Sequence, residues 1–231
     1  MPKERTTQTE IGAYASTLLR KHFGKGPTSV FVTIKKPFVI IHFRGFLAPM
    51  EKILLRQNES KRVLETRDLL MNDLKAEIIL ELWKIAELDI KELYADWNLE
   101  KESGVIIGVT SEKISEEALK WPEEVDREAF TEAINEASIK AEKMPEETAA
   151  YWLNDRSILV RRSQILVEIE KELIKSGFIE PLKLAKRPLE QKVLKEVQLE
   201  AVLKRTISET FVDWNFDSDL GYIVFILDSP K

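Results

Sequence analysis

The fold of this chain is decided by residues 90–109, IKELYADWNLEKESGVIIGV, because the pattern returns at residues 207–226, ISETFVDWNFDSDLGYIVFI. The two stretches align without a gap and share seven identical residues, whereas composition alone gives roughly one. Each holds Asp-Trp-Asn, then a glycine and an apolar run, which is typical of two strands joined by a turn. The chain therefore contains an internal repeat.

The residues before the first stretch extend it to a complete unit. A capping box at Thr7–Glu10 predicts a helix that ends at Gly24. Two β-rich runs, 29–35 and 38–44, predict a hairpin, and helical spacing over 60–86 predicts a long helix. With strands at 91–99 and 104–110, residues 1–110 read as an α-β-β-α-β-β unit.

The second copy is expected to be shorter. Residues 111–154 hold many acids and two Pro-Glu-Glu helix starts, so we expect an acidic helical connector there. Asp155 is expected to cap a helix and Pro188 to open another, so residues 155–231 form a truncated second unit without the first hairpin. The predicted fold class is α+β, built from two unequal repeats.

Composition excludes several classes of protein. The chain has 231 residues, of which 44% are hydrophobic, and no cysteine, so disulfides, thiolate nucleophiles and cysteine zinc sites are excluded. A net charge of -5 argues against a nucleic-acid binder. The first residues do not resemble a secretory signal, and no apolar run is long enough to cross a membrane. We expect a soluble cytoplasmic protein, peripheral at most to a membrane.

The charge is unevenly distributed. Residues 1–50 hold eight Lys and Arg against two Glu, whereas residues 111–155 hold thirteen acids against five bases. One interpretation is that the acidic segment lies against the basic unit. The other is that the basic unit presents a face to an anionic surface or a protein partner.

Two kinds of polar position are candidates for a site. The repeat matches Asp96 and Asn98 with Asp213 and Asn215, which either bind something or else face solvent or hold the following turns. Arg67 lies on the apolar stripe of the long helix, where a partly buried guanidinium needs a carboxylate such as Asp96 or Glu51, or else a ligand. The positions with possible ligand or partner contacts are Gly24, Lys25, Gly26, Pro27, Lys35, Lys36, Arg44 and Arg67.

The loop Gly24-Lys25-Gly26-Pro27 has two interpretations. Its backbone N–H groups and Lys25 suit an anion, but the loop follows a helix C-terminus, where a C-cap and turn is the commoner role. His22 and His42 without cysteine give no common zinc site, and no nucleophile elbow or dinucleotide-binding motif is present. We therefore expect no catalytic residue, metal or cofactor, with enzyme activity left open.

The residues from Leu18 to Pro27, Phe46 to Glu51, Val63 to Arg67 and Gly104 to Val109 resemble the MpsC-like family. The match is good over 11–110 and departs at Lys25, Ala48 and Leu88-Asp89, where that family usually has Arg, Thr and Thr-Gly. Residues 155–231 resemble a degenerate copy that has lost the Gly-x-Gly-Pro loop and its Arg.

This resemblance implies a function that the chemistry alone does not give. The family name refers to a bacterial sodium-translocating, membrane-potential-generating system. It implies an accessory or regulatory component associated with a membrane ion or inorganic-carbon transporter, with a transporter subunit as partner. A small anionic-ligand sensor is the alternative. The repeat further implies a monomeric pseudo-dimer or a homodimer.

Overall fold

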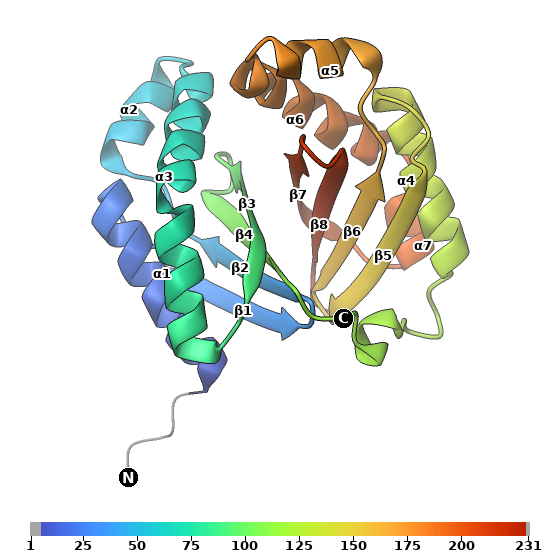
Figure 1. Ribbon diagram of the computed structural model, residues 1–231, viewed down its shortest axis with the longest axis horizontal. Coiled ribbons are helices and arrows are strands. Elements are labelled where there is room, and N and C mark those ends of the chain that lie inside the picture. The colour runs from blue at the N-terminus through green and yellow to red at the C-terminus, as the bar shows by residue number, and fades with distance from the viewer. Residues whose placement is uncertain (1–5, 230–231) are drawn as a thin grey trace. The chain divides into compact units, whose positions relative to one another are not determined.

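The computed structural model describes residues 6–229, which fold as two compact units, residues 6–115 and 116–229 (Figure 1). Each unit contains a four-stranded antiparallel sheet with helices packed on one face. The strand orders, β1-β2-β4-β3 and β5-β6-β8-β7, are equivalent. The predicted α+β fold built from two repeats is confirmed, although the repeats are more alike than predicted.

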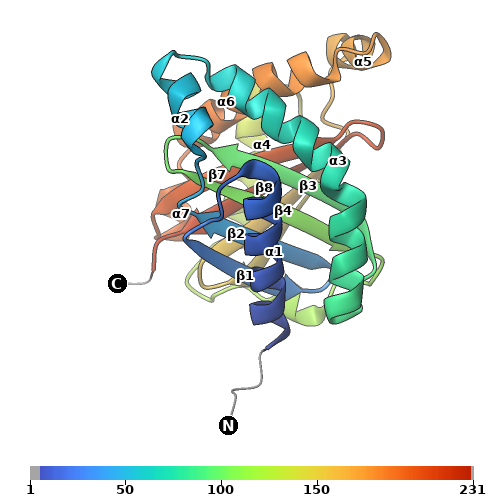
Figure 2. The same ribbon diagram turned by 90° about the vertical axis from the view of Figure 1, so that its left-hand side faces the viewer.

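Unit 1 follows the sequence prediction closely. Its elements are α1 (Thr7–Phe23), β1 (Ser29–Lys35), β2 (Phe38–Arg44), α2 (Pro49–Arg56), α3 (Ser60–Ala86), β3 (Ile90–Asn98) and β4 (Ser103–Thr110). Figure 2 shows α1 and α3 in front of the strands. Alternate residues of β2 (Val39, Ile41 and Phe43) join the core with α1 and α3, as the period of a strand requires.

Unit 2 repeats this order of elements, with η1 added before it and the short α7 added after α6. They are η1 (Glu116–Leu119), α4 (Arg127–Ala141), β5 (Glu147–Asn154), β6 (Ser157–Ser163), α5 (Glu168–Lys175), α6 (Ile179–Glu196), α7 (Leu199–Leu203), β7 (Ile207–Asn215) and β8 (Leu220–Leu227). The helix α4 corresponds to α1, and the hairpin β5-β6 corresponds to β1-β2. The expectation that the second copy lacks this hairpin is therefore wrong.

The missed hairpin has a physical explanation. Residues 150–153 and 157–160 are buried continuously, so the apolar run shows no period of two and is not distinguished from a helix by periodicity. Asp155 does not cap a helix. It lies in the turn between the two strands, where Asn154 Oδ1 accepts hydrogen bonds from the Arg156 backbone N–H (2.8 Å) and the Ser157 hydroxyl (2.9 Å).

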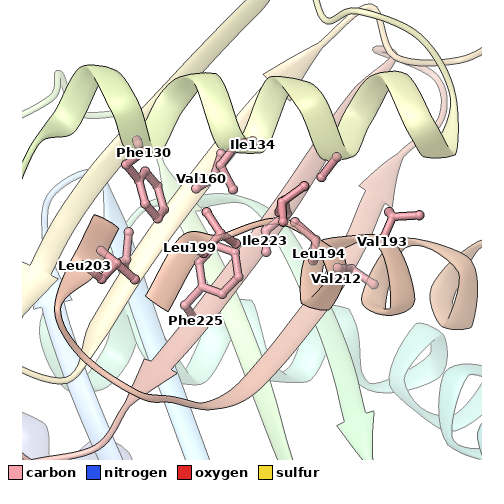
Figure 3. Close-up of a cluster of buried hydrophobic side chains, with 14 of the residues drawn as sticks. Phe130, Ile134, Val160, Val193, Leu194, Leu199, Leu203, Val212, Ile223 and Phe225 are labelled. Carbon is pink, nitrogen blue, oxygen red and sulfur yellow. The ribbon is translucent and has the colours of Figure 1, made fainter. Parts of the chain in front are cut away.

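The segment 111–154 is not a separate helical connector. Its residues supply η1, α4 and β5, and the first unit ends at Ser115. Phe130 and Ile134 of α4 are fully buried and pack in the core of unit 2 with Val160, Leu199 and other side chains (Figure 3). Of the acids in this segment, Glu128, Glu132 and Glu136 lie at exposed positions of α4, and most of the others lie in η1 and in the loops.

Candidate functional site

The most elaborate polar site of unit 1 is built around Arg67. Arg67 lies in the first third of α3 and its side chain is completely buried, with the start of α2 next to it. Arg67 Nε and Nη2 donate to the two carboxylate oxygens of Glu51, each at 2.7 Å, and Nη2 also donates to the Phe46 carbonyl at 3.1 Å. This is the bidentate geometry in which guanidinium–carboxylate pairs are strongest. Of the two carboxylates considered for Arg67, Glu51 is the observed partner.

Aromatic rings enclose the guanidinium. Its central carbon lies 4.7 Å from the ring centre of Phe46 and 5.0 Å from that of Trp97, within the range of cation–π attraction. The Trp97 indole N–H in turn donates to Asp68 at 3.1 Å. Arg67 Nη1 is buried and has no hydrogen-bond partner among residues 6–229. The repeat-matched Trp97 thus forms one wall of the arginine site.

Glu51 has a second role in the same site. It is the third residue of α2, and its Oε2 accepts a hydrogen bond from the Ala48 backbone N–H at 2.7 Å. A carboxylate at this place satisfies an otherwise unpaired donor and suits the positive end of the helix. One carboxylate therefore begins α2 and neutralises the buried arginine of α3.

Unit 2 contains the equivalent site with a lysine. Lys186 of α6 donates to Glu170 Oε1 at 2.9 Å, and Glu170 Oε2 accepts from the Val167 backbone N–H at 3.0 Å. Both ion pairs, Glu51–Arg67 and Glu170–Lys186, join residues that are 16 apart in the chain. The Lys186 ammonium lies 5.6 Å from the Trp214 ring, as Arg67 lies over Trp97.

The second copy has lost the arginine, as expected, but it retains a buried cation at the same place. Sequence reasoning missed Lys186 and Glu170 because the gap-free alignment covered only 207–226. The common spacing of 16 residues between carboxylate and cation, each pair preceding a matching Trp, is the signal that locates them.

A wider buried network surrounds Lys186 in unit 2. Lys186 also pairs with Glu142 and, at 3.5 Å, with Glu190. Arg162, which aligns with Phe43, donates to Glu190 and to the Ser138 hydroxyl, while the Trp214 indole N–H donates to Glu190 at 2.7 Å. A core position that holds a phenyl ring in unit 1 thus holds a charge in unit 2.

Burial shifts the acid–base properties of this network. Desolvation raises the pKa of Glu170, and nearby Glu190 and Asp219 act in the same direction, although the Val167 N–H opposes them. Desolvation also lowers the pKa of Lys186, against the opposite effect of Glu190. Both shifts express the cost of removing a charge from water, which the ion pair only partly offsets.

The loop of residues 24–27 serves as a C-cap and turn. Gly24 ends α1 with a φ of 72°, and its N–H donates to the Arg20 carbonyl at 3.1 Å. A Cβ on Gly26 would lie 2.8 Å from Arg20 Nε, so the loop packs closely against that side chain. Pro27 is buried and Lys25 is exposed.

The corresponding loop of unit 2 is Glu142-Lys143-Met144-Pro145, between α4 and β5. It retains the lysine and the proline, so the expectation that the second copy has lost the whole loop is wrong. Only the two glycines are replaced, and the residue in place of Gly24 is Glu142, whose carboxylate pairs with Lys186.

The basic candidates of unit 1 do not gather at one place. In the β1-β2 hairpin, Ser29 pairs with Arg44 at one end and Lys35 pairs with Phe38 at the other. Seven residues of strand separate these ends by roughly 20 Å. Lys25 precedes β1 on the Arg44 side, while Lys36 adjoins Lys35 and forms an ion pair with Glu112 at 2.7 Å.

The repeat-matched polar residues divide into two roles. Asn98 Oδ1 accepts from the Lys101 N–H at 3.0 Å, and Asn215 Oδ1 accepts from the Ser218 N–H at 3.1 Å, so both hold the turns that follow. Asp96 and Asp213 are buried rather than solvent-facing, and Asp213 pairs with Lys183 at 2.8 Å.

The described residues contain neither a metal-ligating cluster nor a helix that could span a membrane. Within residues 6–229 no group of three or more His, Cys, Asp or Glu side chains is placed to hold a metal ion. Over the same residues no helix is both long enough and apolar enough to cross a membrane.

Comparison with known proteins gives one finding. A family model described as "Na+-translocating membrane potential-generating system (MpsC)" matches residues 3–112 and again residues 128–229. Neither the comparison with curated proteins nor that with solved structures gives a match. The second matched range begins at the start of α4, in agreement with the complete second unit seen in the structure.

Proposed function

This chain belongs to the MpsC family, in two copies, and from that premise we propose that it is a non-catalytic, cytoplasmic accessory or regulatory component of a bacterial membrane ion or inorganic-carbon transport system. The observation that carries the proposal is the family match over both units, since the family is named for a Na+-translocating system that generates a membrane potential. The link is one of family membership rather than of site chemistry.

The contacts of the buried cations support a role in which exposed side chains bind the membrane partner. The buried cations Arg67 and Lys186 are held by Glu51 and Glu170, and they join helices within each unit. We therefore assign the contact with a membrane partner to exposed charges of unit 1, of which Lys25 is the clearest. Such a contact weakens as salt screens the charges.

The test is crosslinking and affinity purification of the tagged chain from native membranes at low and high salt. We expect a transporter subunit to be recovered at low salt and lost when Lys25, Lys35, Lys36 and Arg44 are all changed to Glu. A matched control changes four exposed lysines of unit 2, Lys140, Lys175, Lys192 and Lys195, to Glu. A chain that is recovered without any membrane protein at low salt contradicts the proposal.

A second candidate function is a sensor of small anions. It is favoured by Arg67 Nη1, a buried donor without a hydrogen-bond partner among the described residues. In addition, the loop of residues 24–27 has Gly24 at the position where the loop of unit 2 has the carboxylate Glu142. Saturable thermal stabilisation by bicarbonate or phosphate, absent in Arg67→Lys, is the expected result of a sensor. Equal stabilisation of both variants removes this candidate.

A further inference from the structure

The buried cations of the two units differ in the number of carboxylates around them. In unit 2 the ammonium of Lys186 pairs with three carboxylates, which belong to Glu142, Glu170 and Glu190. In unit 1 the carboxylate that pairs with Arg67 is that of Glu51, the counterpart of Glu170. The positions of the other two carboxylates are therefore held by different residues in unit 1.

The repeat identifies those two positions. The residue four after the cation is Glu190 in unit 2 and Met71 in unit 1, where the methionine side chain is buried. Glu142 is the C-cap of α4, and Gly24 is the C-cap of α1; each is followed by a lysine, one further residue and a proline. Methionine fills the first position with an apolar side chain, whereas glycine leaves the second position without one.

Arg67 has a donor that a further carboxylate would satisfy. Its Nε and Nη2 donate to Glu51 and to the Phe46 carbonyl. Its Nη1 is buried and has no hydrogen-bond partner within residues 6–229. A buried donor without an acceptor costs free energy, because it has given up its hydrogen bonds to water. The guanidinium is thus built for one more acceptor than its own unit supplies.

The C-terminal end of α1 borders this arginine site. The ring centre of Phe23 lies 5.3 Å from that of Phe46 and 5.9 Å from that of Trp97, and these two rings stack on the guanidinium. Gly24 follows directly, and a Cβ at this position would have no atom beyond its chain neighbours within 4 Å. The loop that carries the extra carboxylate in unit 2 therefore lies beside the aromatic wall of the arginine site in unit 1, with open space in place of a side chain.

We propose that unit 1 binds a small carboxylate anion between Gly24 and Arg67 Nη1, in the role that Glu142 has beside Lys186. This assignment rests on the anion sensor described above as a second candidate function, and it narrows the ligand to one chemical class. Because Nη1 is buried, the anion enters as the half-buried ring of Phe23 turns outward.

Three features favour a carboxylate over phosphate. The groups that pair with the two buried cations, Glu51 and Glu142 among them, are carboxylates. The donor left over is a single nitrogen, which together with the exposed Lys25 does not balance the four oxygens and nearly two charges of phosphate. The rings beside the site are apolar and suit the methyl group of a ligand such as acetate.

The first test titrates the full chain with sodium acetate at an ionic strength held constant with sodium chloride. We expect a saturable rise in the temperature of thermal unfolding. Gly24→Glu tethers a carboxylate in the loop, as in unit 2, and should raise the apparent dissociation constant for acetate at least about tenfold. The matched control is Gly24→Ala, which has the same left-handed backbone without a carboxylate and should change that constant less than about twofold.

Acetate that does not stabilise the wild type overturns the proposal, as does acetate that binds Gly24→Glu as tightly as Gly24→Ala. Sodium phosphate at the same ionic strength separates this proposal from the broader one. Stabilisation by phosphate without stabilisation by acetate leaves an anion sensor and refutes the carboxylate. Stabilisation by neither anion removes both. The accessory role at a membrane is measured by recovery with membranes and does not depend on either result.

The second test locates the anion by nuclear magnetic resonance of the backbone amides. We expect acetate to shift the amide signals of Gly24 and Lys25 saturably, with the same dissociation constant as the thermal measurement. The equivalent loop of unit 2 is an internal control, because its own Glu142 already pairs with the cation. Shifts at Glu142 and Lys143 as large as those at Gly24 and Lys25, or no shift at Gly24, overturn the proposed site.

Discussion

Each unit buries one cation beside a carboxylate, and the cation is Arg67 in unit 1 and Lys186 in unit 2. Arg67 satisfies Glu51 with two donors and a backbone carbonyl with one of them. The guanidinium is a planar fork, whereas an ammonium is a compact charge. Lys186 accordingly stands among three carboxylates, Glu142, Glu170 and Glu190. The replacement of arginine by lysine therefore required a different set of neighbours.

We predict that Arg67→Leu destabilises unit 1 by roughly 2–4 kcal/mol, because it leaves the Glu51 carboxylate without its partner. Arg67→Lys is expected to cost less, since an ammonium still reaches one oxygen of Glu51, as Lys186 reaches Glu170. Urea unfolding of the two variants measures the difference. Equal stability of Arg67→Leu and the wild type would mean that the pair contributes nothing to the fold.

The pH dependence of stability tests the raised pKa of Glu170. A carboxyl whose folded pKa exceeds its unfolded pKa binds more protons in the folded state, so its contribution to stability falls as pH rises. The free energy of unfolding of the wild type, minus that of Glu170→Gln, should be largest at pH values below about 4.5. It should decline as pH rises through the folded pKa.

Denaturant unfolding at several pH values measures this difference. The control is Glu168→Gln, which removes a fully exposed carboxyl on the same helix whose pKa is lowered by Lys171. A difference for Glu170→Gln that grows with pH would show that the ion pair with Lys186 outweighs burial.

At the scale of elements, two glycines fix the ends of α1 and β2. Gly24 has a φ of 72° and open space around its missing Cβ. Gly45 has a φ of 65°, and a Cβ there would lie 2.2 Å from the Thr28 hydroxyl oxygen. The Thr28 hydroxyl also donates to the Arg44 carbonyl at 3.0 Å, so the side chain is held in place.

We predict that Gly24→Ala costs about 1 kcal/mol, the penalty for a left-handed conformation alone, and that Gly24→Asn costs less. Gly45→Ala is expected to cost more than Gly24→Ala, because the new methyl group also displaces Thr28. Thermal unfolding of the three variants measures the order of their stabilities. A Gly45→Ala variant as stable as Gly24→Ala would mean that Thr28 moves aside without loss.

At the scale of the whole molecule, the two copies have diverged in different directions. Unit 1 has aromatic rings around Arg67. Unit 2 has a network of charged side chains around Lys186.

The basic residues of unit 1 allow a prediction for the whole protein. The Lys25–Arg44 end and the Lys35–Lys36 end of the hairpin are too far apart to contact one small partner surface together. Lys36 is already paired with Glu112. We therefore expect Lys25→Glu with Arg44→Glu to reduce low-salt recovery with membranes more than Lys35→Glu with Lys36→Glu. Equal losses would indicate an attraction by total charge rather than by one end.

The sequence by itself determined the repeat, the α+β class and nearly every boundary in unit 1. Those features rest on local signals: a glycine C-cap, two β-rich runs and helical spacing over 60–86 act within a few residues. The turn role of Asn98 and Asn215 is local in the same sense. The family resemblance followed from the same stretch of residues, and the match over both units confirmed it.

Only the tertiary structure decided the hairpin of unit 2 and the partners of the buried charges. The strands β5 and β6 are apolar throughout because they are buried, so their pattern does not separate strand from helix. Glu142 and Lys186 are 44 residues apart in the chain, and Arg162 and Glu190 are 28 apart. No local pattern joins such residues, since packing of the sheet and helices brings them together.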